Sequence, residues 1–308
     1  MSGGMGQQLP LTIETGTAVA CNLCGGETAD HLFTKFGFDL VRCRGCGLAF
    51  VGNPPDEEAV KAFYTAQADY HGELLEPGHP SFERMRGVAR QHVAFLKRSR
   101  PDLTGLKVLD IGCSSGLFLD EARKAGAVTF GAELSPDTAR FAATHFGLDI
   151  HQGDWRTAGY VPASFDVITL FDVIEHLPDP HRELKALLPL LKPDGVLLQS
   201  TPDIDGLFPR LSYPLAKSLD YWPHPEPPHH LYQFSAKTLT ALTQAAGYHV
   251  TRADQTNIHL SYSFGSPRHW RRSPKMLAYA ALFAPVAAAA PLLGMGDWLY
   301  LAAERRDD

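Results

Sequence analysis

Four cysteines near the start of the chain have the residue type and spacing of metal ligands. They form two Cys-x-x-Cys pairs, Cys21 with Cys24 and Cys43 with Cys46, with 18 residues between the pairs. This spacing is typical of a zinc site in which each pair forms one knuckle around a tetrahedral ion. Because four sulfur ligands leave no open position, we expect a structural zinc ion in a small zinc ribbon over residues 19–52. Redox chemistry is the alternative, but it does not explain why there are two pairs.

A second group of residues has the pattern of a cofactor loop. The segment Asp110-Ile-Gly112-Cys-Ser-Ser-Gly116 follows an apolar run and precedes a helical pattern. Its small residues allow the backbone to approach a ligand at a helix N-terminus. The dinucleotide pattern G-x-G-x-x-G is not met, because Ser114 and Leu117 stand where it requires glycine. The carboxylate of Asp110 would repel a pyrophosphate but could hold a cationic amino-acid group.

Residues at the ends of the next two expected strands fit the same kind of ligand. Glu133 follows Gly112 by 21 residues, a separation that suits an acceptor for ribose hydroxyls. We expect Asp154 to accept a hydrogen bond from an adenine amine and Trp155 to pack against the ring. Cys113, inside the loop, is expected to be a small filler and not a nucleophile.

These motifs occur in the order and spacing of a known family. VLDIGCSSG, Glu133, the pair Gly153-Asp154, FDVITLFDVIEHLPDP and LLKPDGVLLQSTP together resemble the class I S-adenosylmethionine-dependent methyltransferases whose fourth-strand motif ends in Glu-His. The resemblance covers about residues 85–308. It implies an α/β fold with a Rossmann-like seven-stranded sheet whose last strand is antiparallel. It also implies that S-adenosylmethionine is bound by Asp110, Gly112, Ser114, Gly116, Glu133, Asp154, Trp155, Phe171 and Asp172.

Candidate catalytic residues follow the fourth expected strand. A methyltransferase has to position its acceptor and, when that acceptor is a hydroxyl, to accept its proton. Glu175 and His176 end the fourth-strand motif, and His230 begins a His-Leu-x-x-Phe-Ser segment that is common in the family. We expect His176 or His230 to act as the general base, because the ordinary histidine pKa of about 6.5 suits that task.

Two other interpretations of the same residues stay open. In the first, a second divalent cation orients a diol or catechol and is bound by Asp172, Glu175, His176 and His229 or His230. This resembles the small-RNA 2′-O-methyltransferases and some quinone-ring O-methyltransferases, but their motif has glutamate where this chain has Asp172. In the second, Glu175 and His176 only cap and brace the following loop.

Alternating strand and helix patterns must position these residues. Strands are expected at 106–112, 127–134, 149–154, 165–173, 195–201 and 297–303. Helices are expected at 56–64, 81–99, 117–125, 137–146, 180–192 and 236–246. Strands that alternate with helices predict a parallel sheet with helices on both faces.

The expected domains are a flexible N-terminus at 1–18, the zinc ribbon at 19–52, a helical linker at 53–84 and the methyltransferase domain at 85–308. Within the last, 205–230 and 261–296 are expected to be insertions on the substrate side. Residues 276–294 form a run of 19 residues without a charge, but Pro285 and Pro291 argue against a membrane-spanning helix. This run is either an ordinary packed insertion or a substrate lid or membrane-surface patch beside basic residues at 268–275.

The composition, the net charge and the N-terminal sequence favour some classes of function over others. The 308 residues are 44% hydrophobic, which predicts a globular fold, and the net charge of −6 argues against nucleic-acid binding. The start lacks a signal-peptide pattern, so we expect a cytoplasmic enzyme, with peripheral membrane contact as a further expectation. We expect methyl transfer to oxygen on a small-molecule, glycan or lipid-linked acceptor. The alternatives are C- or N-methylation, an NAD(P)-dependent enzyme, and a zinc-ribbon adaptor without catalysis; nothing in the sequence indicates an oligomeric state.

Overall fold

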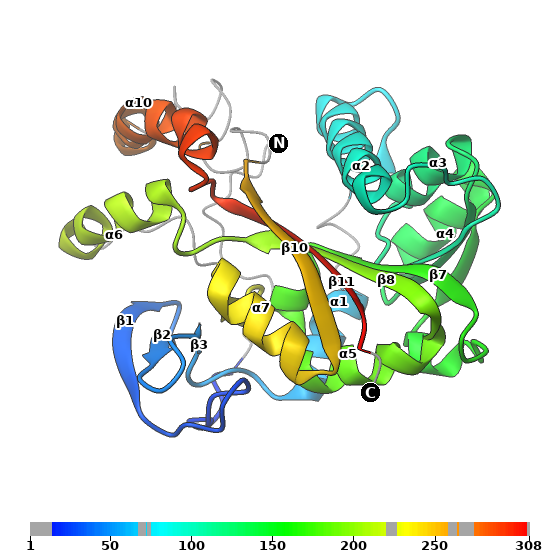
Figure 1. Ribbon diagram of the computed structural model, residues 1–308. Helices are drawn as coiled ribbons and strands as arrows, with labels where there is room; N and C mark the ends of the chain where they lie inside the picture. Colours follow the sequence, from blue (N-terminus) through cyan, green and yellow to red (C-terminus); the bar gives the residue numbers. More distant parts are fainter. Residues whose placement is uncertain are drawn as a thin grey trace. The chain divides into compact units, whose positions relative to one another are not determined.

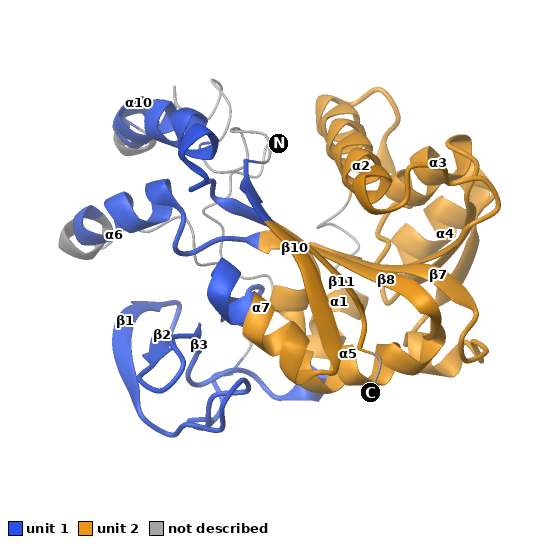
Figure 2. Cartoon of the chain, in the orientation of Figure 1, with its two compact units in different colours: residues 1–59, 202–239, 254–299 blue, residues 60–201, 240–253, 300–308 orange. Residues whose placement is uncertain are grey.

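The computed structural model divides into two units (Figure 2). It describes residues 14–66, 72, 75–219, 227–257, 264 and 274–306. Unit 1 comprises residues 1–59, 202–239 and 254–299, and unit 2 comprises residues 60–201, 240–253 and 300–308. Both units are therefore built from segments that are far apart in the sequence. The four-part organisation expected above stays a prediction, and most of its flexible N-terminus lies outside the described residues.

Unit 2 contains most of a seven-stranded sheet, ordered β10-β11-β8-β7-β4-β5-β6. Figure 1 labels β7, β8, β10 and β11 of this sheet. Its strands are β4 (Lys107–Ile111), β5 (Val128–Glu133), β6 (Asp149–Gln152), β7 (Phe165–Phe171), β8 (Leu191–Pro202), β10 (Tyr248–Thr256) and β11 (Trp298–Arg305). Strands β6, β5, β4, β7 and β8 pair in parallel, and the last strand is antiparallel, which confirms the expected fold class. The chain order reverses between β4 and β7, and open α/β sheets bind ligands at such a switch point.

Helices cover both faces of this sheet. Figure 1 shows α2, α3 and α4 on one face and α5 on the other. The helical elements of unit 2 include α2 (Pro80–Ser99), α3 (Leu117–Lys124), α4 (Pro136–Phe146), α5 (Pro180–Leu187), and the 3-10 turns η2 (Trp155–Thr157) and η3 (Ile174–His176). Proline opens three of them, because its fixed φ and missing N–H suit the first helical position. Along the sequence, α1 (Glu57–Ala66) and α7 (Ala236–Ala245) pass from one unit to the other.

The helix expected at 180–192 is shorter than its sequence pattern indicates. It ends at Leu187, a 3-10 turn η4 (Leu188–Leu190) follows, and β8 begins at Leu191. Pro189 lies in this turn and has no N–H to continue the α-helical ladder. The segment Lys192-Pro193-Asp194-Gly195, which we expected to end the helix, is therefore the first part of a strand.

The cysteine-bearing segment of unit 1 forms a sheet that a distant segment completes. Strands β1 (Ala29–Lys35), β2 (Phe38–Cys43) and β3 (Ala49–Val51) pair in antiparallel order. A fourth strand, β9 (Tyr232–Gln233), pairs with β3 in the same unit. Phe33, Leu40 and Ala49 pack with Ile204 in one apolar cluster. The ribbon thus shares its sheet and its core with a later part of the chain.

Two helices of unit 1 lie side by side (Figure 1). They are α6 (Leu207–Leu219) and α10 (Pro274–Ala289), which continues into the 3-10 turn η5 (Ala290–Leu293). Among the described residues, no helix is long and apolar enough to cross a bilayer. The basic residues that we expected to flank α10, at 268–272, lie outside the described residues.

A histidine lies in the core between α2 and the sheet. His92 is 5% exposed, and its ring stacks on Phe171 with the ring centroids 4.1 Å apart. Phe118 and Tyr300 make edge contacts with the same ring. Burial lowers the pKa of His92 to about 3, so the ring is neutral in the folded protein at neutral pH.

We expect His92→Phe to remove part of the acid sensitivity of the fold. In the wild type the unfolded chain takes up a proton below pH about 6.5, whereas the folded chain does not until about pH 3, so this contribution to stability is lost as the pH falls. The free energy of unfolding of the variant, relative to wild type, should rise by about 3 kcal/mol between pH 8 and pH 4. Urea unfolding at both pH values measures it; a difference that does not change with pH would contradict the burial argument.

Candidate cofactor and active site

The turn after β4 has a backbone conformation that requires glycine. Gly112 and Gly116 have φ of 70° and 77°, in the left-handed region. A Cβ atom on Gly112 would lie 2.7 Å from Cγ2 of Val173, and one on Gly116 would lie 2.7 Å from Cδ1 of Leu148. The N-terminus of α3, directly after Gly116, has no side-chain cap. The expected loop is thus a fixed turn whose backbone can approach a ligand at a helix N-terminus.

Glu133, at the end of β5, connects this loop to the next turn. Its Oε2 accepts a hydrogen bond from the backbone N–H of Ser114, and its Oε1 accepts one from Ser135, both at 2.8 Å. Ser114 has φ of 47°, which is uncommon for a residue with a side chain. Burial raises the pKa of Glu133, and the two backbone hydrogen bonds oppose that rise. Each carboxylate oxygen can still accept a further hydrogen bond, so Glu133 can hold both the loop and a ligand hydroxyl.

Asp110 is buried at the centre of the sheet. It is 4% exposed, and its carboxylate accepts a hydrogen bond of 2.6 Å from the hydroxyl of Thr169. Burial raises the pKa of Asp110 to about 7, and the charges of Glu133 and Asp172 add to the rise. Cys113 is buried beside them, and burial raises the pKa of its thiol well above the usual value. A protonated, buried thiol fits the expected filler role of Cys113.

Asp154 and Trp155 form the turn after β6. Asp154 caps η2 by accepting a hydrogen bond of 3.0 Å from the backbone N–H of Arg156. The indole N–H of Trp155 donates to Glu183, and the guanidinium of Arg156 lies 4.9 Å from the centre of a Trp155 ring. Trp155 is therefore held in place and remains half-buried at the edge expected for adenine.

The end of β7 places two more acidic side chains at the same edge of the sheet. Asp172 has φ of 58°, an uncommon conformation that turns the chain sharply, and it accepts a hydrogen bond of 2.5 Å from the hydroxyl of Ser200. Glu175 is 1% exposed, and its Oε2 has no hydrogen-bond partner in the described part of the chain. Burial raises the pKa of Glu175 well above its usual value, and the charge of Asp172 adds to this. The side chain of Phe171, by contrast, packs against His92 in the core.

His176 has a partner that the sequence did not indicate. The hydroxyl of Tyr64, in α1, lies 2.9 Å from Nδ1 of His176, which is hydrogen-bond distance. The other ring nitrogen, Nε2, lies 4.0 Å from Oε1 of Glu175, which is too long for a hydrogen bond. Tyr64 therefore orients the His176 ring, although it is 112 residues away in the sequence. The sequence predicted only that Tyr64 lies in a linker helix, which does not indicate a contact with His176.

His230 is the expected site residue that belongs to the other unit. It lies in unit 1, directly before β9, and is half-buried. Glu175 and His176 belong to unit 2. A shared catalytic role for the two histidines stays a prediction.

The four cysteines of the two Cys-x-x-Cys pairs converge in unit 1. Their sulfur atoms lie within 4.8 Å of one another, and Cys21–Cys46 and Cys24–Cys43 are each 3.5 Å apart. A tetrahedral ion with bonds of about 2.3 Å needs sulfur atoms roughly 3.8 Å apart. The donor set and its spacing therefore fit one tetrahedral metal ion.

Comparison with known families identifies the larger part of the chain. A family described as a methyltransferase domain matches residues 82–253, more than half of the sequence. The chain belongs to the class I S-adenosylmethionine-dependent methyltransferase family. The match spans the turn after β4, Glu133 at the end of β5, Asp154 after β6, and the Glu175-His176 motif of this methyltransferase domain.

Curated relatives of the methyltransferase domain include O-methyltransferases. The ubiquinone biosynthesis O-methyltransferase of Xanthomonas euvesicatoria is 36% identical over 109 residues, which is 33% of this chain and 46% of that protein. The protein of the same name from Idiomarina loihiensis is 32% identical over 126 residues, 39% of this chain and 52% of the relative. The chain spans about half the length of these relatives.

Solved structures share the methyltransferase fold at low sequence identity. Magnesium protoporphyrin IX methyltransferase from Synechocystis PCC 6803, solved with bound S-adenosylhomocysteine, superposes with a TM-score of 0.54 at 17% identity and covers 82% of this chain and 100% of that one. A chain from the complex of the Haloferax volcanii Trm112 methyltransferase activator with a methyltransferase has a TM-score of 0.51 at 17% identity, with 74% and 96% coverage. These likenesses support the fold.

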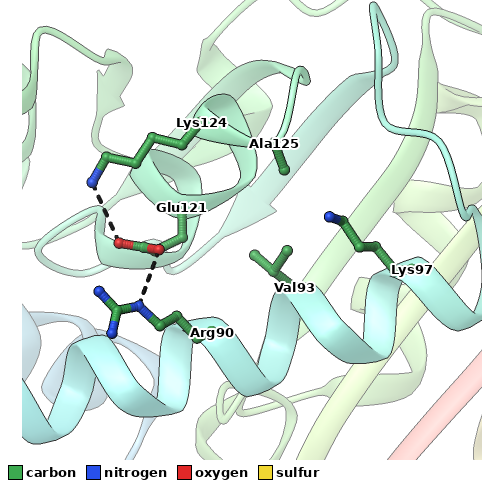
Figure 3. Close-up of a pocket in the computed structure, with 6 residues that line it drawn as sticks. All are labelled: Arg90, Val93, Lys97, Glu121, Lys124 and Ala125. Atoms are coloured by element: carbon green, nitrogen blue, oxygen red, sulfur yellow. Dashed lines mark hydrogen bonds and ion pairs between the residues drawn. The ribbon is translucent and has the colours of Figure 1, made fainter.

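A surface pocket of the methyltransferase domain lies apart from these residues (Figure 3). Glu121 of α3 accepts hydrogen bonds from Arg90 of α2 and from Lys124, both at 3.3 Å. The pocket is lined by Arg90, Val93, Lys97, Glu121, Lys124 and Ala125. None of these is an expected site residue, and the ion pair between Arg90 and Glu121 joins α2 to α3.

Proposed function

We propose that the chain transfers a methyl group from S-adenosylmethionine to an oxygen atom of a small-molecule acceptor. The supporting observation is a group of carboxylates near the C-terminal ends of three neighbouring strands: Asp110 in β4, Glu133 at the end of β5, and Asp172 and Glu175 after β7. Burial and mutual repulsion raise the pKa of Asp110 and Glu175, so this edge of the sheet favours a positively charged ligand. S-adenosylmethionine carries a sulfonium and an ammonium group, whereas the pyrophosphate of NAD would be repelled.

The positions of these residues support the following proposed cofactor-binding roles. Glu133 accepts hydrogen bonds from the ribose hydroxyls, Asp154 accepts one from the adenine amine, and Asp110 offers its carboxylate to the ammonium group. Gly112, Ser114, Gly116, Phe171 and Asp172 complete the cofactor site, and Trp155 packs against the adenine. When bound, S-adenosylmethionine supplies a methyl group on a positively charged sulfur that is a good leaving group.

His176 is the residue that we propose to accept the proton of the acceptor hydroxyl. If the Nδ1–H of His176 donates to the hydroxyl oxygen of Tyr64, Nε2 carries the lone pair that takes this proton. His230 is a second candidate base from unit 1, and Glu175 completes the proposed catalytic group.

We expect His176→Ala to lower turnover by about 100-fold or more, because general bases contribute roughly that much. Tyr64→Phe should lower turnover less, by roughly 10-fold, and should shift the pH profile, since only ring orientation and tautomer are lost. The measurement uses methyl-labelled S-adenosylmethionine with a panel of catechols, sugars and polyprenylated phenols. His230→Ala in the same assay tests the second candidate.

Two controls make this assay decisive. All variants should keep their affinity for S-adenosylhomocysteine, and His249→Ala, at an exposed position of β10, should have wild-type turnover. Normal turnover in both His176→Ala and His230→Ala would refute the base hypothesis.

A second divalent cation remains the other candidate mechanism. Its supporting observation is the buried Oε2 of Glu175, which has no hydrogen-bond partner among the described residues and could ligate a metal. Asp172 and His176 offer further ligands nearby in the sequence. If a chelator abolishes turnover while the cysteine site keeps its metal, the cation mechanism replaces the base mechanism.

The remaining assignments are also proposals. We propose that the four-cysteine site binds structural zinc and that the acceptor is a small hydroxylated molecule, a glycan or a lipid-linked intermediate. The name O-methyltransferase of the curated relatives supports oxygen over carbon or nitrogen. A cytoplasmic location, the absence of nucleic-acid partners and the four-part domain organisation stay predictions.

A further inference from the structure

One face of α10 is covered by its own unit. Tyr279, Phe283 and Ala287 are buried on this face. They form an apolar cluster with Phe208 of α6 and with Phe264, and the centres of the Phe208 and Phe283 rings are 5.6 Å apart. The packing between α6 and α10 therefore buries only this face of α10.

The opposite face of α10 is exposed and entirely apolar. Its described exposed residues are Leu277, Ala278, Ala281, Leu282, Pro285, Ala288 and Ala289. Leu282 is 57% exposed, and in η5 Leu292 and Leu293 are 88% and 68% exposed. From Leu277 to Leu293 only Tyr279 carries a polar group, and that side chain is buried. A helix that is apolar on all sides is normally buried, so this face calls for a covering partner.

The exposed apolar surface continues onto α6. Leu211 and Leu215, one turn apart on this helix, are 52% and 37% exposed. Arg210, beside them, is also exposed. Figure 1 shows α6 and α10 adjacent in the same unit. We call the exposed leucines of α6, α10 and η5 the leucine surface: Leu211, Leu215, Leu277, Leu282, Leu292 and Leu293.

The charges of these helices have one sign. The helices α6 and α10 contain Arg210, Lys217 and Lys275 and no Asp or Glu, in a chain whose net charge is −6. More widely, the sequence has no acidic residue from Gln255 to Gly296. Acidic residues are thus excluded from the part of the sequence that carries the most exposed leucines.

We infer that the leucine surface docks onto an anionic lipid bilayer. Exposed apolar side chains on helices that carry only basic charges, with the exposed Arg210 beside Leu211, are the pattern of an element that lies in the interface of a membrane. Such an element is held by apolar burial and by attraction to anionic headgroups. A second copy of the chain fits less well, because a two-fold contact through this surface would bring like charges together. The 16-residue α10 contains Pro285 and lies on the bilayer without spanning it.

Vesicle flotation with the full chain tests this inference independently of any methyltransferase activity. The probes are phosphatidylcholine vesicles and vesicles of equal parts phosphatidylcholine and phosphatidylglycerol. We expect the protein to float with the anionic vesicles, with binding weakened about 10-fold in 0.5 M salt or with neutral vesicles. The double variant Leu292→Glu/Leu293→Glu should lose about 10-fold or more of the binding, because two exposed apolar anchors are removed. Arg210→Glu should lose roughly 5-fold or more.

Val161→Glu is the matched control. Val161 is a 66% exposed apolar residue of unit 2, whereas the leucine surface belongs to unit 1. It should float as the wild type does. Affinity for S-adenosylhomocysteine shows in each variant that the fold is intact. Absence of wild-type binding to anionic vesicles, or wild-type binding by the double variant, would overturn the inference. Concentration-dependent dimerisation that the double variant abolishes, without vesicle binding, would assign the surface to self-association instead.

Discussion

Replacing Glu133 by alanine should lower the affinity for S-adenosylhomocysteine by at least about 100-fold, or about 2.7 kcal/mol. The carboxylate is proposed to accept hydrogen bonds from the ribose hydroxyls, and it holds the backbone N–H groups of Ser114 and Ser135 at 2.8 Å. The variant loses both sets of hydrogen bonds, so the cofactor loop is released as well as the ribose. Isothermal titration calorimetry measures the effect directly.

Two further variants separate these contributions. Glu133→Gln keeps one oxygen acceptor and should lose less affinity than Glu133→Ala. Glu121→Gln changes an acidic residue of α3 that is bonded to Arg90 and Lys124 and not to the loop, so it should bind as the wild type does. Equal affinities in wild type and Glu133→Ala would remove Glu133 from the cofactor site.

Removal of the metal from the cysteine site should unfold the ribbon. Binding of structural zinc supplies on the order of 10 kcal/mol of folding free energy in small cysteine-rich modules. Cys43 ends β2, Cys46 lies between β2 and β3, and β9 pairs with β3. We expect Cys43→Ser, or a strong chelator, to remove about one zinc ion per chain, lower the melting temperature and expose the ribbon to protease. Elemental analysis and thermal unfolding measure these changes.

Cys113→Ser is the control for this experiment, because Cys113 is buried in the cofactor loop outside the four-sulfur group. It should keep the zinc content of the wild type. A purified wild-type chain that contains no metal and whose cysteines form disulfides would contradict the zinc assignment.

The sequence predicted the parts of the fold in which local pattern and tertiary structure agree. Apolar strands alternating with helices indicated the parallel sheet, and the glycines at 112 and 116 indicated the turn after β4, because only glycine fits there. The spacing of Cys21, Cys24, Cys43 and Cys46 indicated the four-sulfur cluster. In each case the chemical requirement is visible in residue type and spacing alone.

Other features depend on contacts that leave no local signal. Strand β9 has two residues, too few for an alternating pattern, and it forms because β3 offers an edge. The helix ending at Leu187 was overestimated because its apolar periodicity continues past Pro189. The contact of Tyr64 with His176 joins positions 112 residues apart, and nothing in either segment predicts it. The exposed face of α10 is likewise a property of packing, since the sequence shows only that the whole run is apolar.

The carboxylate-lined edge of the sheet is central to the functional proposal. It distinguishes a positively charged sulfonium ligand from a pyrophosphate-containing one, because buried acids whose pKa is raised gain stability when a cation binds beside them. The family match independently places the chain among S-adenosylmethionine-dependent methyltransferases. The assay with methyl-labelled S-adenosylmethionine and a panel of acceptors is the measurement that identifies the acceptor.

Calorimetric titration of the wild-type chain with S-adenosylhomocysteine, and separately with NAD, tests the central claim most directly. The expected result is saturable binding of one S-adenosylhomocysteine per chain and no measurable binding of NAD. Binding of NAD without affinity for S-adenosylhomocysteine, or no binding of either ligand, would contradict the proposal that this chain is an active methyltransferase.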